Sequence, residues 1–248
     1  MKNSLPNDNA LNHTLAARPD FERARRKGVP EVILASNKSV AQSLAITASF
    51  LERTGRAILS RVPPALEEAL HETYGDRLEW YPASRAAIVR SGERAARNHG
   101  GRVGVVTAGT SDQPIAEEAA LVCQEMDCAV FPVYDVGVAG LHRLFEPLRR
   151  LLEEDQVDVV VVAAGMDGAL PSVVSGLVDV PVIGTGGVTT GRDAIEMIMA
   201  GATAVGVGSA VYWRGPEVFS HINEEIQTYM AEHDLQSLSA ICGVAHER

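Results

Sequence analysis

The stretch over residues 157–163 constrains the fold of this chain most, because it consists almost entirely of valine. Val159 to Val162 form an unbroken β-branched run, and the alternation of apolar and polar residues is missing there. A strand with this pattern is buried on both faces, as in a parallel sheet that helices cover on each side. The sequence therefore predicts an α/β fold built around this strand.

Further short strands are predicted on both sides of it, and helical patterns follow them. These strands cover residues 103–107, 129–133, 181–184 and 204–207, and helices are predicted from Pro114 and over 140–153. Leu141, Leu144, Phe145 and Leu148 have the spacing of one apolar face of the second helix. Alternating strands and helices indicate a three-layer fold with a parallel sheet.

The N-terminal part has a different pattern, and we expect a small α+β domain over residues 18–98. A helix is predicted to end near Lys27, strands are predicted over 32–35 and 57–62, and helices over 39–54 and 64–74. Residues 91–101 are polar and glycine-rich, which is typical of a domain boundary. Residues 1–17 are predicted to be a disordered leader, and residues 99–248 the main α/β domain.

Composition excludes several classes of function. The net charge of −10 argues against nonspecific nucleic-acid binding, and no apolar run is long enough to cross a bilayer. The three cysteines have neither metal-site nor disulfide-framework spacing, and we expect Cys123 and Cys128 to be buried as hydrophobic residues around a helix end. The same cysteine spacing predicts no metal site. No signal segment begins the chain, so we expect a cytoplasmic protein.

Polar loops follow the first three strands of the main domain, where parallel sheets bind ligands. Gly109, Thr110, Ser111 and Asp112 lie at a predicted helix start that favours an anion, or else Ser111 and Asp112 only cap that helix. His142 and Arg143 follow Gly140, as a proton shuttle and an anion clamp or as a solvated helix start.

The third of these loops holds a carboxylate between two glycines. Asp167 lies in the segment from Gly165 to Gly168, directly after the valine-rich strand. This position suggests a general acid or base, with a simple turn residue as the alternative. We expect the turns at 109–112, 140–143 and 165–168 to converge on one pocket.

The last two strands end in glycine-rich loops. Gly186 and Gly187 follow one strand, and Gly208 and Ser209 follow the next, each before a helical pattern. Backbone N–H groups in two such loops form a phosphate cradle, as at the last strands of many (β/α)₈ barrels.

Three of these loop motifs resemble a known family. The segments are VGVVTAGTSDQPIAEEA, VYDVGVAGLHR and VVVVAAGMDGALPSVVSGLVDVPVI, and the N-terminal segment is DFERARRKGVPEVI. Over residues 18–183 they are similar to the nickel-pincer cofactor biosynthesis family, which shares its fold with aminoimidazole ribonucleotide carboxylase.

The resemblance implies a flavodoxin-like, carboxylase-like domain that carboxylates the pyridinium ring of nicotinic acid adenine dinucleotide, with bicarbonate or CO₂ as co-substrate and release of AMP. It implies that Asp167 and His142 are catalytic, and that Gly109 to Asp112, Arg143, Gly165 and Gly168 bind the dinucleotide. It also implies a homo-oligomer.

From about Val180 the chain departs from that family. The segment VPVIGTGGVTTGRDAIEMIMAGATAVGVGSAVYWRGPEVF is similar to the C-terminal end of dihydroorotate dehydrogenase, and this likeness extends over 180–248. It implies that Gly186, Gly187, Gly208 and Ser209 hold the phosphate of flavin mononucleotide (FMN). The sequence thus resembles a chimera joined at VDVPVIG. The alternatives to a carboxylase are an FMN-binding protein of the dehydrogenase type and a nucleotide-phosphate-binding module without turnover.

Overall fold

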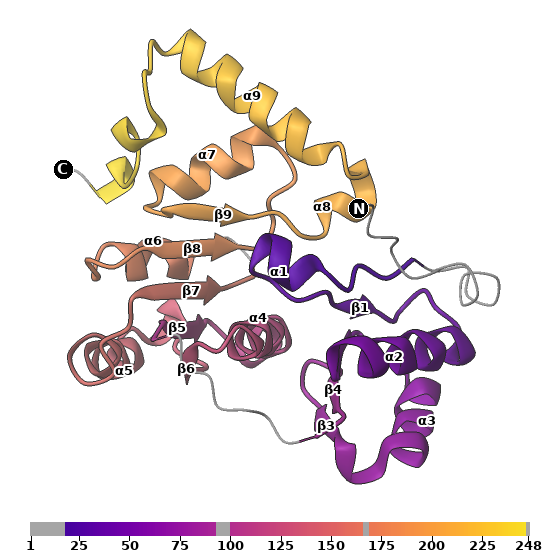
Figure 1. The fold of residues 1–248 in the computed structure, drawn as a ribbon. Coiled ribbons are helices and arrows are strands. Elements are labelled where there is room, and N and C mark those ends of the chain that lie inside the picture. The colour runs from indigo at the N-terminus through magenta and orange to yellow at the C-terminus, as the bar shows by residue number, and fades with distance from the viewer. Residues whose placement is uncertain (1–17, 93–99, 166–168, 247–248) are drawn as a thin grey trace, which may run out of the picture. The chain divides into compact units, whose positions relative to one another are not determined.

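The computed structural model describes residues 18–92, 100–165 and 169–246 of the chain. These residues fall into two compact units, whose division lies between Arg97 and Asn98, and each unit is described by itself (Figure 1). Among the described residues, no helix combines the length and the apolar character that crossing a bilayer requires. The predicted leader, residues 1–17, lies outside the described residues.

Unit 1 is a four-stranded sheet with helices. Its elements are α1 (Arg23–Lys27), β1 (Ile33–Leu34), α2 (Val40–Thr54), β2 (Arg56–Ser60), α3 (Pro64–Tyr74), the 3₁₀ helix Gly75–Arg77, β3 (Leu78–Tyr81) and β4 (Ala86–Arg90). The strand order is β1-β2-β4-β3. β1 pairs with β2 in parallel, and the other two pairings are antiparallel.

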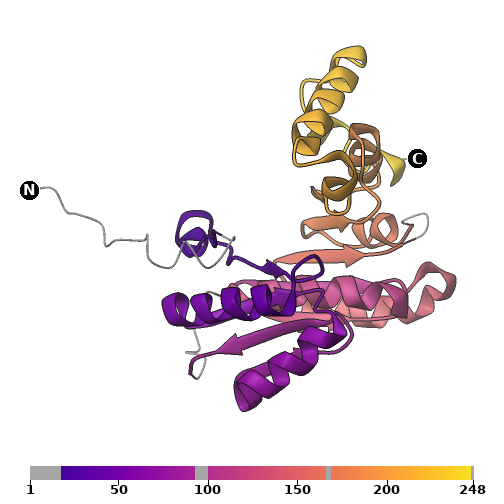
Figure 2. The same cartoon turned by 90° about the vertical axis from the view of Figure 1, so that its right-hand side faces the viewer.

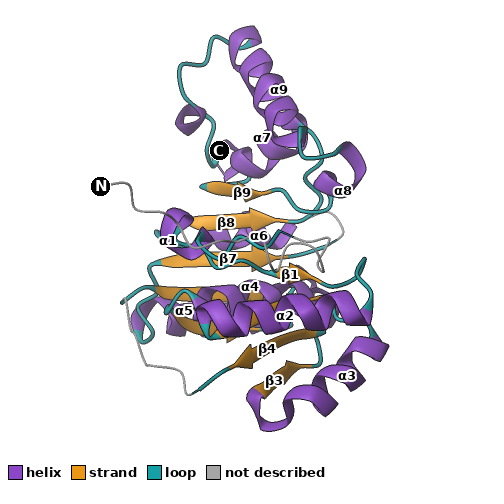
Figure 3. Ribbon diagram, turned by 45° about the vertical axis from the view of Figure 1, so that its right-hand side comes forward, coloured by secondary structure: helices purple, strands orange, loops and turns teal. Residues whose placement is uncertain are grey.

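Local sequence signals set the ends of α2, and its apolar face forms the core of unit 1. Ser39 caps the first turn in a capping box with Gln42, and Gly55 ends the helix in the left-handed conformation. Ile46 and Phe50 are buried, and they pack in one cluster with residues of α3 and the sheet. Figure 3 shows α2 and α3 beside β3 and β4.

Unit 2 is built on an all-parallel five-stranded sheet. Its elements are β5 (Arg102–Thr107), the 3₁₀ helix Thr110–Asp112, α4 (Gln113–Glu125), β6 (Ala129–Val133), the 3₁₀ helix Val138–Gly140, α5 (His142–Glu153), β7 (Val159–Ala163), α6 (Ala169–Ser175), β8 (Val182–Thr185), α7 (Gly191–Met199), β9 (Ala204–Gly206), α8 (Ala210–Arg214), α9 (Val218–Glu232), and the 3₁₀ helices Leu238–Ala240 and Val244–His246. The order is β6-β5-β7-β8-β9, so the valine-rich strand β7 is central.

Helices cover both faces of the central strands, which confirms the three-layer α/β fold. On one face, Ala116 and Ala120 of α4 pack against Val105 and Val161. On the other face, leucines of α5 and α6 pack against Val160 and its neighbours. The core residues of this second face also include Val106, Leu144, Leu148, Leu151, Val162, Leu170, Val174 and Val182.

Helix α9 packs on α7, beyond the last strand of the sheet (Figure 2). The two helices approach closely at Gly191, where a Cβ atom would lie 2.4 Å from Cβ of Glu225 and 2.9 Å from the Ile222 carbonyl oxygen. Only glycine fits this contact without moving α9.

Three local predictions were wrong. Strand β3 was not predicted. Leu141 and Phe145 are 38% and 52% exposed, whereas Leu144, Leu148 and Leu151 form the buried face of α5. Cys123 and Cys128 are half-buried and not fully buried.

Candidate functional site

The five parallel strands of unit 2 end at one rim of the sheet, and backbone contacts join the loops that follow them. The Val136 N–H donates to the Thr107 carbonyl oxygen over 3.0 Å, and the Ala108 N–H donates to that of Ala163 over 3.3 Å. A Cβ atom on Gly137 would lie 2.6 Å from the Ala108 carbonyl oxygen. The loops after β5, β6 and β7 therefore touch at the rim.

Asp112, in the loop after β5, lies beside the loop after β7. Its Oδ2 accepts a 2.9 Å hydrogen bond from the Gly109 N–H, and its Oδ1 would lie 3.3 Å from a Cβ atom on Gly165. Thr110 and Ser111 lie between these contacts and are exposed. The predicted turns at 109–112 and at Gly165 thus come together, with two hydroxyl groups facing solvent beside the start of α4.

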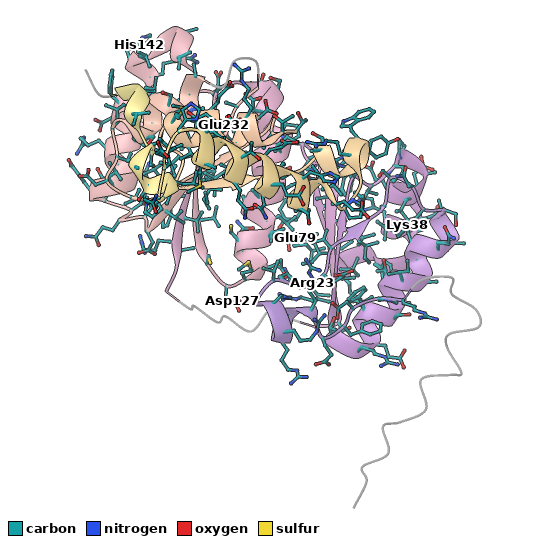
Figure 4. All side chains as sticks on the ribbon, turned by 90° about the horizontal axis from the view of Figure 1, so that it is seen from above. Arg23, Lys38, Glu79, Asp127, His142 and Glu232 are labelled. Carbon is teal, nitrogen blue, oxygen red and sulfur yellow. The ribbon has the colours of Figure 1, made fainter. Side chains whose placement is uncertain are left out.

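The predicted turn at 140–143 is connected to the end of β5 through Asp135. Arg143 donates from Nη1 to Oδ2 of Asp135 over 2.9 Å, and the Asp135 N–H donates to Oγ1 of Thr107 over 3.0 Å. This chain of bonds connects Arg143 to the end of β5. His142 is exposed at the start of α5, at the edge of the unit (Figure 4).

Two predicted site residues cannot be placed. Asp167 and Gly168 lie outside the described residues, so the catalytic role that we expect for Asp167 stays a prediction. Gly165 is the last described residue after β7, and Ala169 is the first residue of α6.

The glycine-rich loops after β8 and β9 offer backbone donors. Gly186 and Gly187 have φ values of 109° and 71°, which L-residues with side chains rarely adopt. Within the described part of the chain, the N–H groups of Gly187, Gly208 and Ser209 donate no hydrogen bond. All three residues are exposed, so these groups are open to an anion.

A network beside these loops was not predicted from the sequence. Glu225 of α9 accepts from the Gly191 N–H and, over 2.9 Å, from Nη2 of Arg214, which also donates to the Thr189 carbonyl oxygen. The hydrogen bond from Gly191 and that from Arg214 hold the pKa of Glu225 below its usual value. The network fixes α8 and α9 at the start of α7.

Asp193 fixes the start of α7 from within. Burial alone would raise the pKa of Asp193, but hydrogen bonds from the backbone and side chain of Thr189 and from Thr190 outweigh it, so the pKa is lowered. The Oδ2 atom accepts from the Thr189 N–H over 2.9 Å and from the Thr190 N–H over 2.8 Å. This carboxylate is therefore a capping residue of the loop after β8.

The cysteines lie away from the rim. Cys123 and Cys128 bracket the C-terminal end of α4, and Sγ of Cys242 contacts the Ala202 carbonyl oxygen, which precedes β9. These positions belong to the opposite end of the sheet. Among the described residues, no three His, Cys, Asp or Glu side chains gather as a metal site would require.

A cavity of about 680 Å³ lies between α7 and α9, on the helical side of the unit. Ile195, Met199 and Tyr229 give it an apolar wall, and Glu196 and Glu232 contribute carboxylates. None of the site residues predicted from the sequence lines this cavity.

Comparisons with known proteins divide the chain in two. The sequence model of the LarB/PurE-like N-terminal domain matches residues 11–91, and that of dihydroorotate dehydrogenase matches residues 170–230. A protein of Methanocaldococcus jannaschii, named "Uncharacterized protein MJ0165", is 38% identical over 170 residues, which are 66% of this chain and 65% of that protein.

Catalytic subunits of dihydroorotate dehydrogenase B (NAD(+)) match a shorter part. Those of Methanocaldococcus jannaschii and Thermococcus kodakarensis are 51% and 49% identical over 69 residues, which are 28% of this chain and 22% and 23% of the subunits. The chain thus spans just under two thirds of the first relative and less than a quarter of these subunits.

Among solved structures, ligand-free dihydroorotate dehydrogenase of Eimeria tenella matches with a TM-score of 0.40 and 19% identity, over 48% of this chain and 40% of that one. The sequence matches are consistent with the chimeric pattern. The chain joins an N-terminal part similar to the LarB/PurE-like N-terminal domain to a C-terminal part similar to dihydroorotate dehydrogenase.

Proposed function

We propose that unit 2 binds nicotinic acid adenine dinucleotide at the rim and carboxylates its pyridinium ring, with bicarbonate or CO₂ as co-substrate and AMP as the leaving product. The observation that carries this proposal is the position of Asp112, which is hydrogen-bonded to Gly109 and lies beside Gly165, because it places two of the predicted substrate loops side by side. The match of residues 11–91 to the LarB/PurE-like N-terminal domain supports a carboxylase of this kind.

The roles of the residues follow from their positions at the rim. The exposed hydroxyl groups of Thr110 and Ser111, beside the start of α4, face a phosphate of the dinucleotide. The ion pair between Arg143 and Asp135 is half-exposed and therefore weak, so a carboxylate or phosphate of the substrate replaces Asp135 as the partner of Arg143. We assign proton transfer to Asp167 and His142, as the resemblance implies.

The test is an assay for AMP with nicotinic acid adenine dinucleotide and bicarbonate. We expect AMP and a carboxylated mononucleotide in equal amounts, and we expect Asp167→Asn to abolish both. Asp179→Asn is the matched control, since Asp179 is exposed before β8, at the opposite end of the sheet. Full turnover by Asp167→Asn would refute the role of that residue, and absence of AMP from the unaltered protein would refute the reaction.

A second function, the binding of FMN, is favoured by the open N–H groups of Gly187, Gly208 and Ser209. They fit the phosphate of FMN, and the match of residues 170–230 to dihydroorotate dehydrogenase covers both loops. A cysteine thiol near the substrate could activate the pyridinium ring by covalent attack, but all three cysteines lie at the other end of the sheet, which favours nucleotide binding without turnover. FMN, when bound, would supply redox chemistry.

Flavin binding is tested by titrating the protein with FMN and with riboflavin, while flavin fluorescence is followed. If the glycine loops hold a phosphate, FMN binds and riboflavin, which lacks the phosphate, does not. Equal binding of both flavins, or of neither, would contradict a phosphate cradle for FMN. A yellow purified protein would favour this function, and a colourless protein that releases AMP would favour the carboxylase.

A further inference from the structure

Two cysteines bracket the end of α4 in a defined hydrogen-bonded turn. The helix ends at Glu125, and Asp127 adopts the left-handed conformation with a φ of 63°. The Cys128 N–H donates to the Cys123 carbonyl oxygen over 3.1 Å, and the Asp127 N–H donates to that of Gln124 over 2.9 Å. This pair of bonds is the Schellman motif, in which Cys123 and Cys128 occupy its outer positions.

The motif brings the side chains of its outer positions into contact, and in most proteins this contact is hydrophobic. Here both side chains carry thiols, and both pack in the same apolar cluster as Val103 and Val130. The Schellman motif thus places two thiols side by side, as an intramolecular disulfide requires, because disulfides span Cα separations of about 4.4–6.8 Å. Burial raises the pKa of the Cys123 thiol, and the neighbouring Cys128 raises it further, as expected of two close sulfur atoms.

Gly101 leaves the space that the pair needs. A Cβ atom at Gly101 would lie 3.2 Å from Sγ of Cys128, so a side chain there would press on the sulfur. Both cysteines are half-buried, so a small reagent has partial access to them. Cys242 is exposed and contacts the Ala202 carbonyl oxygen on a different part of the unit, so it serves as an internal control.

We propose that Cys123 and Cys128 are a thiol–disulfide modification site, which a small-molecule disulfide such as oxidised glutathione converts to an intramolecular disulfide. The thiolate of one cysteine attacks a sulfur of oxidised glutathione, the S–S bond of glutathione breaks, and one glutathione thiolate leaves. The second cysteine then attacks the protein sulfur of the mixed disulfide and releases the second glutathione. The protein loses two protons and two electrons, and oxidised glutathione becomes two reduced molecules.

The first experiment uses the unaltered protein. It is equilibrated in mixtures of reduced and oxidised glutathione, free thiols are blocked by alkylation, and the denatured chain is cleaved after glutamate. Cleavage after Glu125 separates the two cysteines, so a disulfide between them leaves the two peptides joined until a reductant is added. We expect joined peptides containing Cys123 and Cys128. Peptides that stay separate, or a bridge that contains Cys242, would overturn the proposal.

The second experiment asks whether the fold positions the pair. In the Cys242→Ala variant, the equilibrium constant for disulfide formation is compared between the folded protein and the protein unfolded in urea. A preformed pair has a higher effective concentration, so we expect the folded protein to favour the disulfide by at least about tenfold. Equal constants in the two states, or a larger one in urea, would overturn the proposal. Cys128→Ala in the same Cys242→Ala background is the negative control, and it leaves Cys123 with no other thiol for an intramolecular bridge.

Discussion

Replacing Gly137 with alanine perturbs the contact between two rim loops and little else. Gly137 has φ −63° and ψ 160°, which alanine adopts without strain. The new methyl group would lie 2.6 Å from the Ala108 carbonyl oxygen. Ordinary contact begins at 3.4 Å, so the loops after β5 and β6 must separate by about 0.8 Å.

The cost of this separation can be estimated. Overpacking of a close contact costs about 1–3 kcal/mol, and here the opposing atom is backbone, which has no rotamer to change. We expect a loss of about 2 kcal/mol in the free energy of unfolding of unit 2, or about 4–8 °C in its melting temperature. Nicotinic acid adenine dinucleotide should also bind more weakly, because the displaced loop holds residues 109–112.

The assay is urea unfolding followed by far-ultraviolet circular dichroism. Trp80 fluorescence, measured in a Trp213→Phe background because Trp213 lies in unit 2, is a separate probe of unit 1. Gly208→Ala is the matched control for stability, since a Cβ atom there meets nothing within 4 Å. Unit 1 should unfold unchanged in both variants. If Gly137→Ala were as stable as Gly208→Ala, the close approach of the two rim loops would be refuted.

Three further predictions concern charges and thiols. Because hydrogen bonds lower the pKa of Asp193 in the folded state, its contribution to stability is present above the unfolded pKa of about 3.9 and is lost as pH falls through the folded pKa. The difference in urea midpoint between the unaltered protein and Asp193→Asn should therefore shrink as the pH falls toward about 3, one unit below the unfolded pKa. A difference that does not change with pH would contradict a lowered pKa for Asp193. Arg143→Ala should cost less than about 1 kcal/mol in thermal unfolding, since its pair with Asp135 is half-exposed; a larger loss would mean that the pair is structural. Burial raises the pKa of Cys123, so its alkylation rate should rise at higher pH in the folded protein than in urea; coincident profiles would contradict this.

The sequence predicts what local rules control. Ser39 and Gly55 bound α2 through capping, and the valine run marks β7, because these signals act within a few residues. Strand β3 was missed because its residues are only partly buried and form a strand by pairing with β4. The buried face of α5 was misplaced, since a tertiary contact selects it: Gly104 leaves room for Leu151, whose Cδ1 would lie 3.2 Å from a Cβ atom there.

The candidate site divides in the same way. The order of strands and helices predicts that the loops share one rim, and Oδ1 of Asp112 lies beside Gly165, 3.3 Å from where its Cβ atom would be. Convergence of the three turns on one pocket stays a prediction. The ion pair between Arg214 and Glu225 forms because α9 packs on α7, and no local pattern in the sequence predicts that packing. The one sequence signal of this packing is Gly191, a glycine at the start of α7 where no turn requires one.

Hydrogen exchange, measured with and without nicotinic acid adenine dinucleotide, tests most directly whether the rim of unit 2 binds a nucleotide. We predict slower exchange at residues 109–112 and no change at the cysteine end of α4. Slower exchange confined to other segments, or none at saturating dinucleotide, would contradict the account.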